Sequence, residues 1–436
     1  MSLAMSLRSR GPAGSAARTA AVLSRFGVTA AGMAGRLDRY MRLLSDLGVR
    51  PTWPTTACVL ARHPALLRGY ADRGAELALH GLVHGDHAVL DRRRQRETIA
   101  KAAEIFSRAG IAAVGFRGPY LRYNDATLEV LKELGFRWHS SQAVAFPMLA
   151  CDPAQARVAS YGLALRLYSA HDAASVAARP RLRDGLVDIP VAIPDDETMV
   201  ERLRLEGADA GAQWVHMLDR THERGDLFTI QLHPERIREL DGALRETLTA
   251  ARRREPAVFV ARLDEIAEWW RRRSRFSVQV LRAGDGRYRV RLDADDDVTL
   301  LVRGCNVEAA PWYGNDAVAH GRDLEVRSAR VPVMGVSRRS PAAVGALLAE
   351  EGVPVEVSDA RDAYGGYVDV GAEWRESEVL DAIDRAPGPL VRIWRWPRGM
   401  RSALAVTGDI DALTLRDFLL RSWETRASAQ AGRHRS

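Results

Sequence analysis

Two histidines spaced four residues apart could hold a metal ion. His80 and His84 stand in the run Ala-Leu-His-Gly-Leu-Val-His-Gly, and Gly81 and Gly85 give the backbone freedom to turn both imidazoles toward one point. Neutral imidazole is a good ligand for zinc, nickel or cobalt, and two imidazoles with one carboxylate leave positions open for water and substrate. No carboxylate precedes the pair where a hydrolytic metal centre would need one.

A suitable pair of carboxylates occurs near the other end of the sequence. Asp409 and Asp411 follow an apolar run in Ala-Val-Thr-Gly-Asp-Ile-Asp-Ala. If this segment meets the histidines in the fold, the residues predict a metal-dependent hydrolase whose barrel is closed by its own C-terminal segment, with the Asp411 carboxylate within about 5 Å of both imidazoles. The alternative is that Asp411 or Thr414 caps the helix that follows.

The elements that must position these residues alternate between helix and strand from about residue 20 to 270. Repeated units of this kind predict a parallel sheet or barrel, in which chemistry collects at the C-terminal ends of the strands. We expect helices at 22–47, 57–73, 97–108, 126–134 and 198–205, and strands at 49–53, 76–79, 113–116, 187–193 and 227–232. Four polar residues fall at such strand ends, namely His80, Arg117, Asp195 and His233.

The pattern changes after residue 272, which divides the chain into four predicted parts. Residues 1–272 form the barrel, and alternation with a period of two predicts a small antiparallel β region over 273–330. An α/β segment follows over 331–400, and residues 401–422 supply a strand and a helix that complete the barrel. The sequence does not indicate a function for residues 273–400.

The composition is that of an ordinary globular protein with a basic bias. The chain has 436 residues and a formal charge of +7, but its basic residues are almost all arginine, with lysine only at Lys101 and Lys132. Base composition of the genome explains such a bias better than a selected ligand does. The arginine clusters lack interleaved aromatic residues, so we expect no nucleic-acid partner.

Cysteine usage and hydropathy bear on the compartment. Cys58, Cys151 and Cys305 stand far apart without a CxxC pair, which fits a reducing compartment. The apolar run at the N-terminus is too short for a signal-peptide core, and no stretch has the length of a membrane span. We therefore expect a cytoplasmic protein without a transmembrane segment, while peripheral contact with a membrane stays open.

Several short motifs occur in order between about residues 20 and 270. They are Val49-Arg-Pro-Thr-Trp53, Glu76-Leu-Ala-Leu-His-Gly-Leu-Val-His84, Gly115-Phe-Arg-Gly-Pro-Tyr120, Thr127-Leu-Glu-Val-Leu-Lys-Glu-Leu-Gly-Phe136, Ser140-Ser141 and Phe228-Thr-Ile-Gln-Leu-His-Pro234. Together they resemble the polysaccharide deacetylases of NodB homology, carbohydrate esterase family 4. The resemblance implies a distorted (β/α) barrel that removes N-acetyl groups from amino sugars with one divalent metal ion, zinc first and cobalt or nickel as alternatives.

The resemblance also implies a metal set and a general base. In the family, two histidines and one aspartate hold the metal, which carries over to His80, His84 and Asp411. The other aspartate of a D-x-D motif is the general base, which would be Asp409. The family's first motif should stand before the first helix, where this chain has arginine and serine instead, so the resemblance points to a circularly permuted barrel.

Further roles follow for four residues. Arg117 would orient the base, His233 would be the general acid, and the backbone N–H of Tyr120 would reach the oxyanion. Asp195 follows a strand and could touch the sugar or replace a ligand, while Asp196 is expected to cap the next helix. The family's fourth motif, which contains Asp and Trp, is not recognisable.

Two other functions remain open from the sequence. The barrel could have lost its metal, with Arg8 or Arg10 filling the cavity, and act as a carbohydrate-binding or scaffold protein. It could also hydrolyse other non-peptide C–N bonds, because related barrels act on amides that are not sugars. The expected partner for the main hypothesis is an N-acetylated sugar, glycan or glycolipid precursor.

Overall fold

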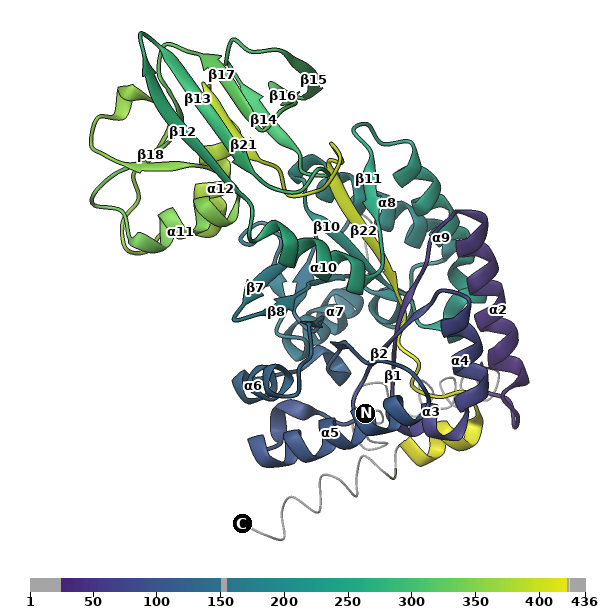
Figure 1. Ribbon diagram of the computed structural model, residues 1–436. Helices are drawn as coiled ribbons and strands as arrows, with labels where there is room; N and C mark the ends of the chain where they lie inside the picture. The colour runs from purple at the N-terminus through teal and green to yellow at the C-terminus, as the bar shows by residue number, and fades with distance from the viewer. Residues whose placement is uncertain (1–24, 150–154, 422, 424–436) are drawn as a thin grey trace.

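The computed structural model describes residues 25–149, 155–421 and 423. Arg8, Arg10 and Cys151, which entered the sequence argument, lie outside these residues. The described chain forms an α/β barrel with a smaller body attached to one end (Figure 1). This confirms the predicted fold class of a distorted (β/α) barrel with additional β and α/β regions.

The barrel is built on a nine-stranded sheet. Its hydrogen-bonded order is β10-β22-β1-β2-β3-β4-β8-β7, and β11 also pairs with β22. The strands are β1 (Thr52–Thr55), β2 (Glu76–Leu79), β3 (Gly115–Phe116), β4 (Trp138–His139), β7 (Arg181–Arg183), β8 (Leu186–Asp188), β10 (Leu227–Gln231), β11 (Val258–Val260) and β22 (Ser402–Thr407). A short parallel sheet extends the wall between β8 and β10, and its strands are β5 (Ala143–Ala145), β6 (His171–Asp172) and β9 (Val191–Ile193).

β22 lies inside the barrel wall although it follows all the other barrel strands in the chain. It pairs in parallel with β10 from Leu227↔Ala403 to Gln231↔Thr407, and on its other side with β11 and with Thr52 of β1. In Figure 1 the yellow arrow of β22 runs alongside the teal β10. Every residue of β22 is buried, and the pleat places Leu404 in one apolar cluster and Ala405 in another.

Helices cover the outside of the barrel. They are α2 (Ala31–Asp46), α3 (Ala57–Arg62), α4 (Pro64–Asp72), α5 (Arg92–Arg108), α6 (Asp125–Glu133), α7 (Gln155–Leu167), α8 (Gly207–Arg224) and α9 (Ile237–Arg252). The single helix expected over 57–73 is in fact α3 and α4. Proline has no N–H to continue a helix but suits its first position, so Pro64 begins a new one.

The attached body follows α10 (Leu263–Arg273) and contains three small sheets. The first is antiparallel, with β12 (Ser277–Gly284), β13 (Arg287–Asp293) and β17 (Asp323–Arg327). The second joins β14 (Leu300–Arg303), β15 (Ala309–Tyr313), β16 (Asp316–Ala319) and β21 (Leu390–Ile393). The third is parallel, with β18 (Val331–Val336), β19 (Val355–Val357) and β20 (Tyr364–Val368), flanked by α11 (Ala342–Glu350) and α12 (Glu376–Arg385).

The antiparallel and α/β segments expected from the sequence share one sheet, because β21 pairs with β14. Buried ion pairs connect this body to the barrel. The Glu351 carboxylate lies 2.7 Å from both Arg179 and Arg395, and Arg395 also lies 2.8 Å from Asp226, just before β10.

Within the described ranges, no helix combines the length and hydropathy needed to cross a membrane.

Candidate metal and catalytic site

His80, His84 and Asp411 meet at the C-terminal end of the barrel strands. One ligand atom from each lies within 4.8 Å of the others, and all three residues are buried. His80 Nε2 is 3.5 Å from one Asp411 carboxylate oxygen, and His84 Nε2 is 3.4 Å from the other. These distances meet the expectation from the sequence, because the isolated Thr55↔Ile410 bridge holds the segment after β22 against the end of β1.

Two atoms of this group are suited to a metal ion. The Arg117 backbone carbonyl lies 2.8 Å from His80 Nδ1, so this nitrogen is the one that carries the ring proton and donates it. The lone pair of His80 is then on Nε2. Both His80 Nε2 and Asp411 Oδ1 are buried, and among the described residues neither has a hydrogen-bond partner, which is costly unless a cation lies between them. The donor set of two imidazoles and one carboxylate therefore fits zinc, cobalt or nickel.

The second oxygen of Asp411 is already engaged by a cation of the chain. Arg421, in the C-terminal helix that begins at Leu415, lies 2.8 Å from Asp411 Oδ2 and 3.0 Å from His84 Nδ1. Burial raises the pKa of Asp411, but Arg421 and the two imidazoles lower it by more, so the carboxyl stays ionised well below its ordinary range. Burial, then Arg421, lowers the pKa of His84 and keeps that ring neutral.

Asp409 lies beside the metal set, and two polar side chains hold its carboxylate. Arg117 Nη1 donates to one carboxylate oxygen at 3.1 Å, and the Gln231 amide donates to the other at 3.1 Å. The same Arg117 nitrogen donates to the Thr407 hydroxyl at 2.8 Å. Asp409 Oδ2 is 3.6 Å from His80 Nε2, so the carboxylate faces the place where a metal-bound substrate would react.

His233 forms a partly buried pair with Asp196 on the same edge. Its ring Nδ1 lies 2.8 Å from Asp196, which also accepts the His233 backbone N–H at 2.9 Å. Arg236 donates to the same carboxylate at 3.2 Å. Burial lowers the pKa of His233, but Asp196 outweighs burial and holds that pKa well above its ordinary value. His233 is thereby kept in the protonated form that a general acid requires.

The structure gives the capping role expected of Asp196 to its neighbour Asp195. Asp195, expected near the substrate, accepts the Thr198 backbone N–H at 2.9 Å and so provides the cap that was expected from Asp196. Burial and then Asp196 raise the pKa of Asp195 to about 6. Asp196 instead holds His233. The turn after β9 decides which of the two carboxylates reaches His233, and sequence alone does not show this.

Tyr120 lies against the metal set in a left-handed backbone conformation. Its φ is 61°, and its ring meets that of His84 edge-on with 4.4 Å between centroids. A non-glycine residue at such φ is uncommon and requires support from its surroundings. Ser141 supplies some of it, since its hydroxyl accepts the Gly118 N–H at 2.9 Å. Arg117 also donates to the Ser140 hydroxyl at 2.9 Å, so the Ser140-Ser141 pair supports the Arg117 loop.

Three further residues of the site were not identified from the sequence. Asp196 was taken for a cap, and Gln231 and Arg421 received no role. The position of Gln231 at the end of β10, two residues before His233, was a usable signal. Arg421 had none, because its proximity to His84 depends on how the last helix packs.

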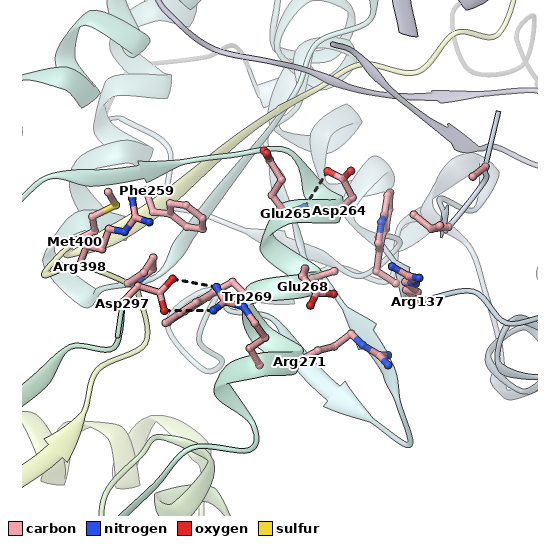
Figure 2. Close-up of a pocket in the computed structure, with 16 residues that line it drawn as sticks. Arg137, Phe259, Asp264, Glu265, Glu268, Trp269, Arg271, Asp297, Arg398 and Met400 are labelled. Carbon is pink, nitrogen blue, oxygen red and sulfur yellow. Dashed lines mark hydrogen bonds and ion pairs between the residues drawn. The ribbon is translucent and has the colours of Figure 1, made fainter. Parts of the chain in front are cut away.

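A cavity of about 680 Å³ lies at the opposite end of the barrel (Figure 2). Its lining includes Val114 and Arg137, which directly precede β3 and β4, together with residues of α10. The two charged side chains Arg272 and Asp297 pair with each other across it at 3.0 Å. Because active sites of (β/α) barrels form at the C-terminal strand ends, this cavity is not the candidate catalytic site.

Comparisons with known proteins matched part of the chain. Residues 14–139 match the family model described as polysaccharide deacetylase. A peptidoglycan deacetylase-like protein of Gibberella zeae is 32% identical over 113 residues, which cover 25% of this chain and 33% of that protein. The chain thus spans about a third of the length of this curated relative.

Two solved structures align with part of the chain. A Mycobacterium smegmatis protein described as a polysaccharide deacetylase aligns at 24% identity with a TM-score of 0.41, covering 54% of this chain and 76% of the other. A Pseudomonas aeruginosa protein with the same description aligns at 19% identity with a TM-score of 0.42, covering 55% and 73%.

Proposed function

We propose that this chain is a metal-dependent hydrolase of the polysaccharide deacetylase type, because its residues 14–139 match that family's model. It would remove N-acetyl groups from an amino-sugar-containing glycan or glycolipid precursor. The observation that carries the proposal is the placement of Asp411 with His80 and His84, which gives a complete three-ligand set. The sugar itself is inferred from the family and not from a contact.

The proposal includes a circular permutation of the barrel. A strand followed by D-x-D normally begins such a domain, whereas here β22 brings Asp409 and Asp411 from the far end of the chain. The insertion of β22 between β10 and β1 supports this connectivity. In this view residues 1–272 and 401–422 form one catalytic domain, and residues 273–330 and 331–400 form regions attached to it.

A divalent ion held by His80, His84 and Asp411 would polarise the amide carbonyl and make a nearby water more acidic. Asp409 would take a proton from that water as its oxygen attacks the acyl carbon. Arg117 and Gln231 hold both oxygens of the Asp409 carboxylate, so the base is oriented before substrate arrives. The backbone N–H of Tyr120 would donate to the oxygen on which negative charge develops.

His233 would complete the reaction by giving its proton to the departing nitrogen. The carbon–nitrogen bond then breaks, and acetate and the free amine are released. Asp196 keeps the imidazole protonated and fixes which ring nitrogen faces the reaction. Asp409 would therefore accept a proton when water attacks, whereas Asp196 would support the proton donation by His233 to the departing amine.

Metal analysis of two variants tests the proposal. The wild-type protein should carry about one equivalent of divalent metal and release acetate from N-acetylated amino-sugar oligomers. Asp411→Ala should lose the metal, because it removes one of three ligands, whereas Asp409→Ala should keep the metal and lose turnover. Elemental analysis and an acetate assay measure the two effects separately.

Equal metal content in wild type and Asp411→Ala would contradict the metal set and favour the carbohydrate-binding or scaffold function. Loss of metal from Asp411→Ala without acetate release by wild type would point to a different amide. A panel of cyclic amides would then distinguish hydrolysis of other C–N bonds.

A further inference from the structure

The Arg421 side chain lies directly beside the proposed metal ligands. Its two terminal nitrogens reach Asp411 Oδ2 at 2.8 Å and His84 Nδ1 at 3.0 Å. It therefore contacts two of the three proposed ligands, and its side chain keeps partial access to solvent, with 24% exposed.

The contact with His84 fixes the position of the ring proton. A guanidinium N–H can only donate, so His84 Nδ1 must accept, and the proton of the neutral ring then lies on Nε2. That nitrogen faces Asp411 at 3.4 Å. A metal ion needs the lone pair of Nε2, which would move the proton to Nδ1 and set two donors against each other at 3.0 Å. Coordination by His84 and the Arg421 contact therefore exclude each other.

The charges in the site lead to the same conclusion. Asp409 is paired with Arg117, and Asp411 is paired with Arg421, so each carboxylate of the D-x-D segment has a cationic partner. A divalent ion added beside Asp411 would lie within a few ångströms of the Arg421 guanidinium, in a region where burial strengthens electrostatic repulsion. The guanidinium must move away for the ion to be bound tightly.

The helix that carries Arg421 is anchored to the barrel. The Asp417 carboxylate accepts from the Thr414 hydroxyl at 2.9 Å and lies 3.0 Å from His63 Nε2. Phe418 stacks on Phe26 with 5.4 Å between ring centroids. Because these contacts hold the helix, we expect the Arg421 side chain to move when a metal ion binds and the helix to stay in place.

We propose that Arg421 is an internal cation that competes with the metal ion for Asp411 and His84 and so sets the metal affinity of the site. This inference rests on the proposed metal-dependent function. Arg421 then positions Asp411 and His84 when no metal ion is bound, and it is not a catalytic residue.

The zinc affinity of full-length variants tests this competition. The dissociation constant for Zn²⁺, measured by competition with a coloured chelator, should fall about tenfold or more in Arg421→Gln, because the variant removes the charge but keeps a polar side chain. Arg421→Lys keeps the positive charge, so its affinity for Zn²⁺ should increase much less. Arg416→Gln changes an exposed arginine of the same helix and should bind zinc as wild type does.

An unchanged or higher dissociation constant in Arg421→Gln would overturn the competition and assign Arg421 a supporting role at Asp411. A zinc-loaded crystal in which Arg421 still contacts both Asp411 and His84 would do the same. If neither wild type nor Arg421→Gln binds zinc, the metal centre itself fails, and that result is distinguishable from the failure of Arg421 alone.

Discussion

The Asp196 side chain connects the backbone and the chemistry of one histidine. It accepts both the N–H and the ring proton of His233, so the conformation of the loop and the protonation of the imidazole depend on the same carboxylate. The residue types of the site could be predicted from the sequence, because histidines and aspartates at strand ends are recognisable. The choice between Asp195 and Asp196 could not, since two adjacent carboxylates are equivalent until the turn is known.

Asp196→Asn should narrow the pH range of the enzyme. Asp196 raises the pKa of His233 and burial lowers it, so loss of the negative charge should bring that pKa down. His233 would then lose its proton at a lower pH, so the alkaline limb of the kcat–pH profile should also shift to lower pH. A kcat–pH profile measures this shift.

Asp195→Asn is the matched control, because it changes the neighbouring carboxylate but leaves the Asp196–His233 pair in place. Its alkaline limb should follow that of wild type. An unshifted limb in Asp196→Asn would show that His233 does not control this part of the profile.

At the scale of elements, β22 is a strand whose existence was predicted and whose position depended on a hypothesis about connectivity. The apolar run and the aspartates after it predict a strand ending at Thr407, as observed. Its neighbours could not be deduced from pattern, because all buried parallel strands have similar apolar sequences. The single helix predicted over 57–73 was wrong for a local reason. Pro64 signals the start of a new helix, but the apolar pattern appeared continuous across it.

Leu404→Ala should destabilise the barrel strongly. Leu404 is completely buried in β22 and packs in the main apolar cluster, so truncation leaves a cavity and should lower the free energy of unfolding by about 2–5 kcal/mol. Urea unfolding measures the change. Leu419→Ala, at a residue that is 62% exposed, should change it by less than about 0.5 kcal/mol. Similar losses in both variants would contradict a central position for β22.

At the scale of the whole molecule, buried arginines join the attached body to the barrel. Arg179 and Arg395 both contact Glu351, although they come from different parts of the chain. The excess of arginine was attributed from sequence to base composition, and that argument gives no means of identifying which arginines are buried. Such pairs depend on tertiary packing, because each partner is distant in sequence.

Glu351→Gln should lower stability at neutral pH and less so in acid. Burial raises the pKa of Glu351, but Arg395 and Arg179 outweigh it and lower that pKa to about 2 from an ordinary 4.5. The stabilising charge is therefore fully present above about pH 4.5 and is lost as the pH falls toward 2. We expect a loss of about 3–5 kcal/mol at pH 7, because two buried cations each lose one of their carboxylate partners.

Urea unfolding at pH 7 and pH 3 measures this difference, which should be smaller at pH 3. The control is Glu325→Gln, which removes an exposed carboxylate 3.6 Å from Arg327 and should cost less than about 1 kcal/mol. A loss for Glu351→Gln that is equal at both pH values would show that its charge is not the source of stability.

The late position of β22 has a consequence for biosynthesis. Every other strand of the barrel has been synthesised by residue 260, yet β10 and β1 must wait for residues 402–407 before their shared partner exists. Until then two strand edges stay open to wrong pairing, which is a hazard for a nascent chain. A chain that stops in the attached body contains both histidines and neither carboxylate of the centre. Translation of the last segment therefore completes the barrel sheet and brings together the residues of the proposed metal site in the same event.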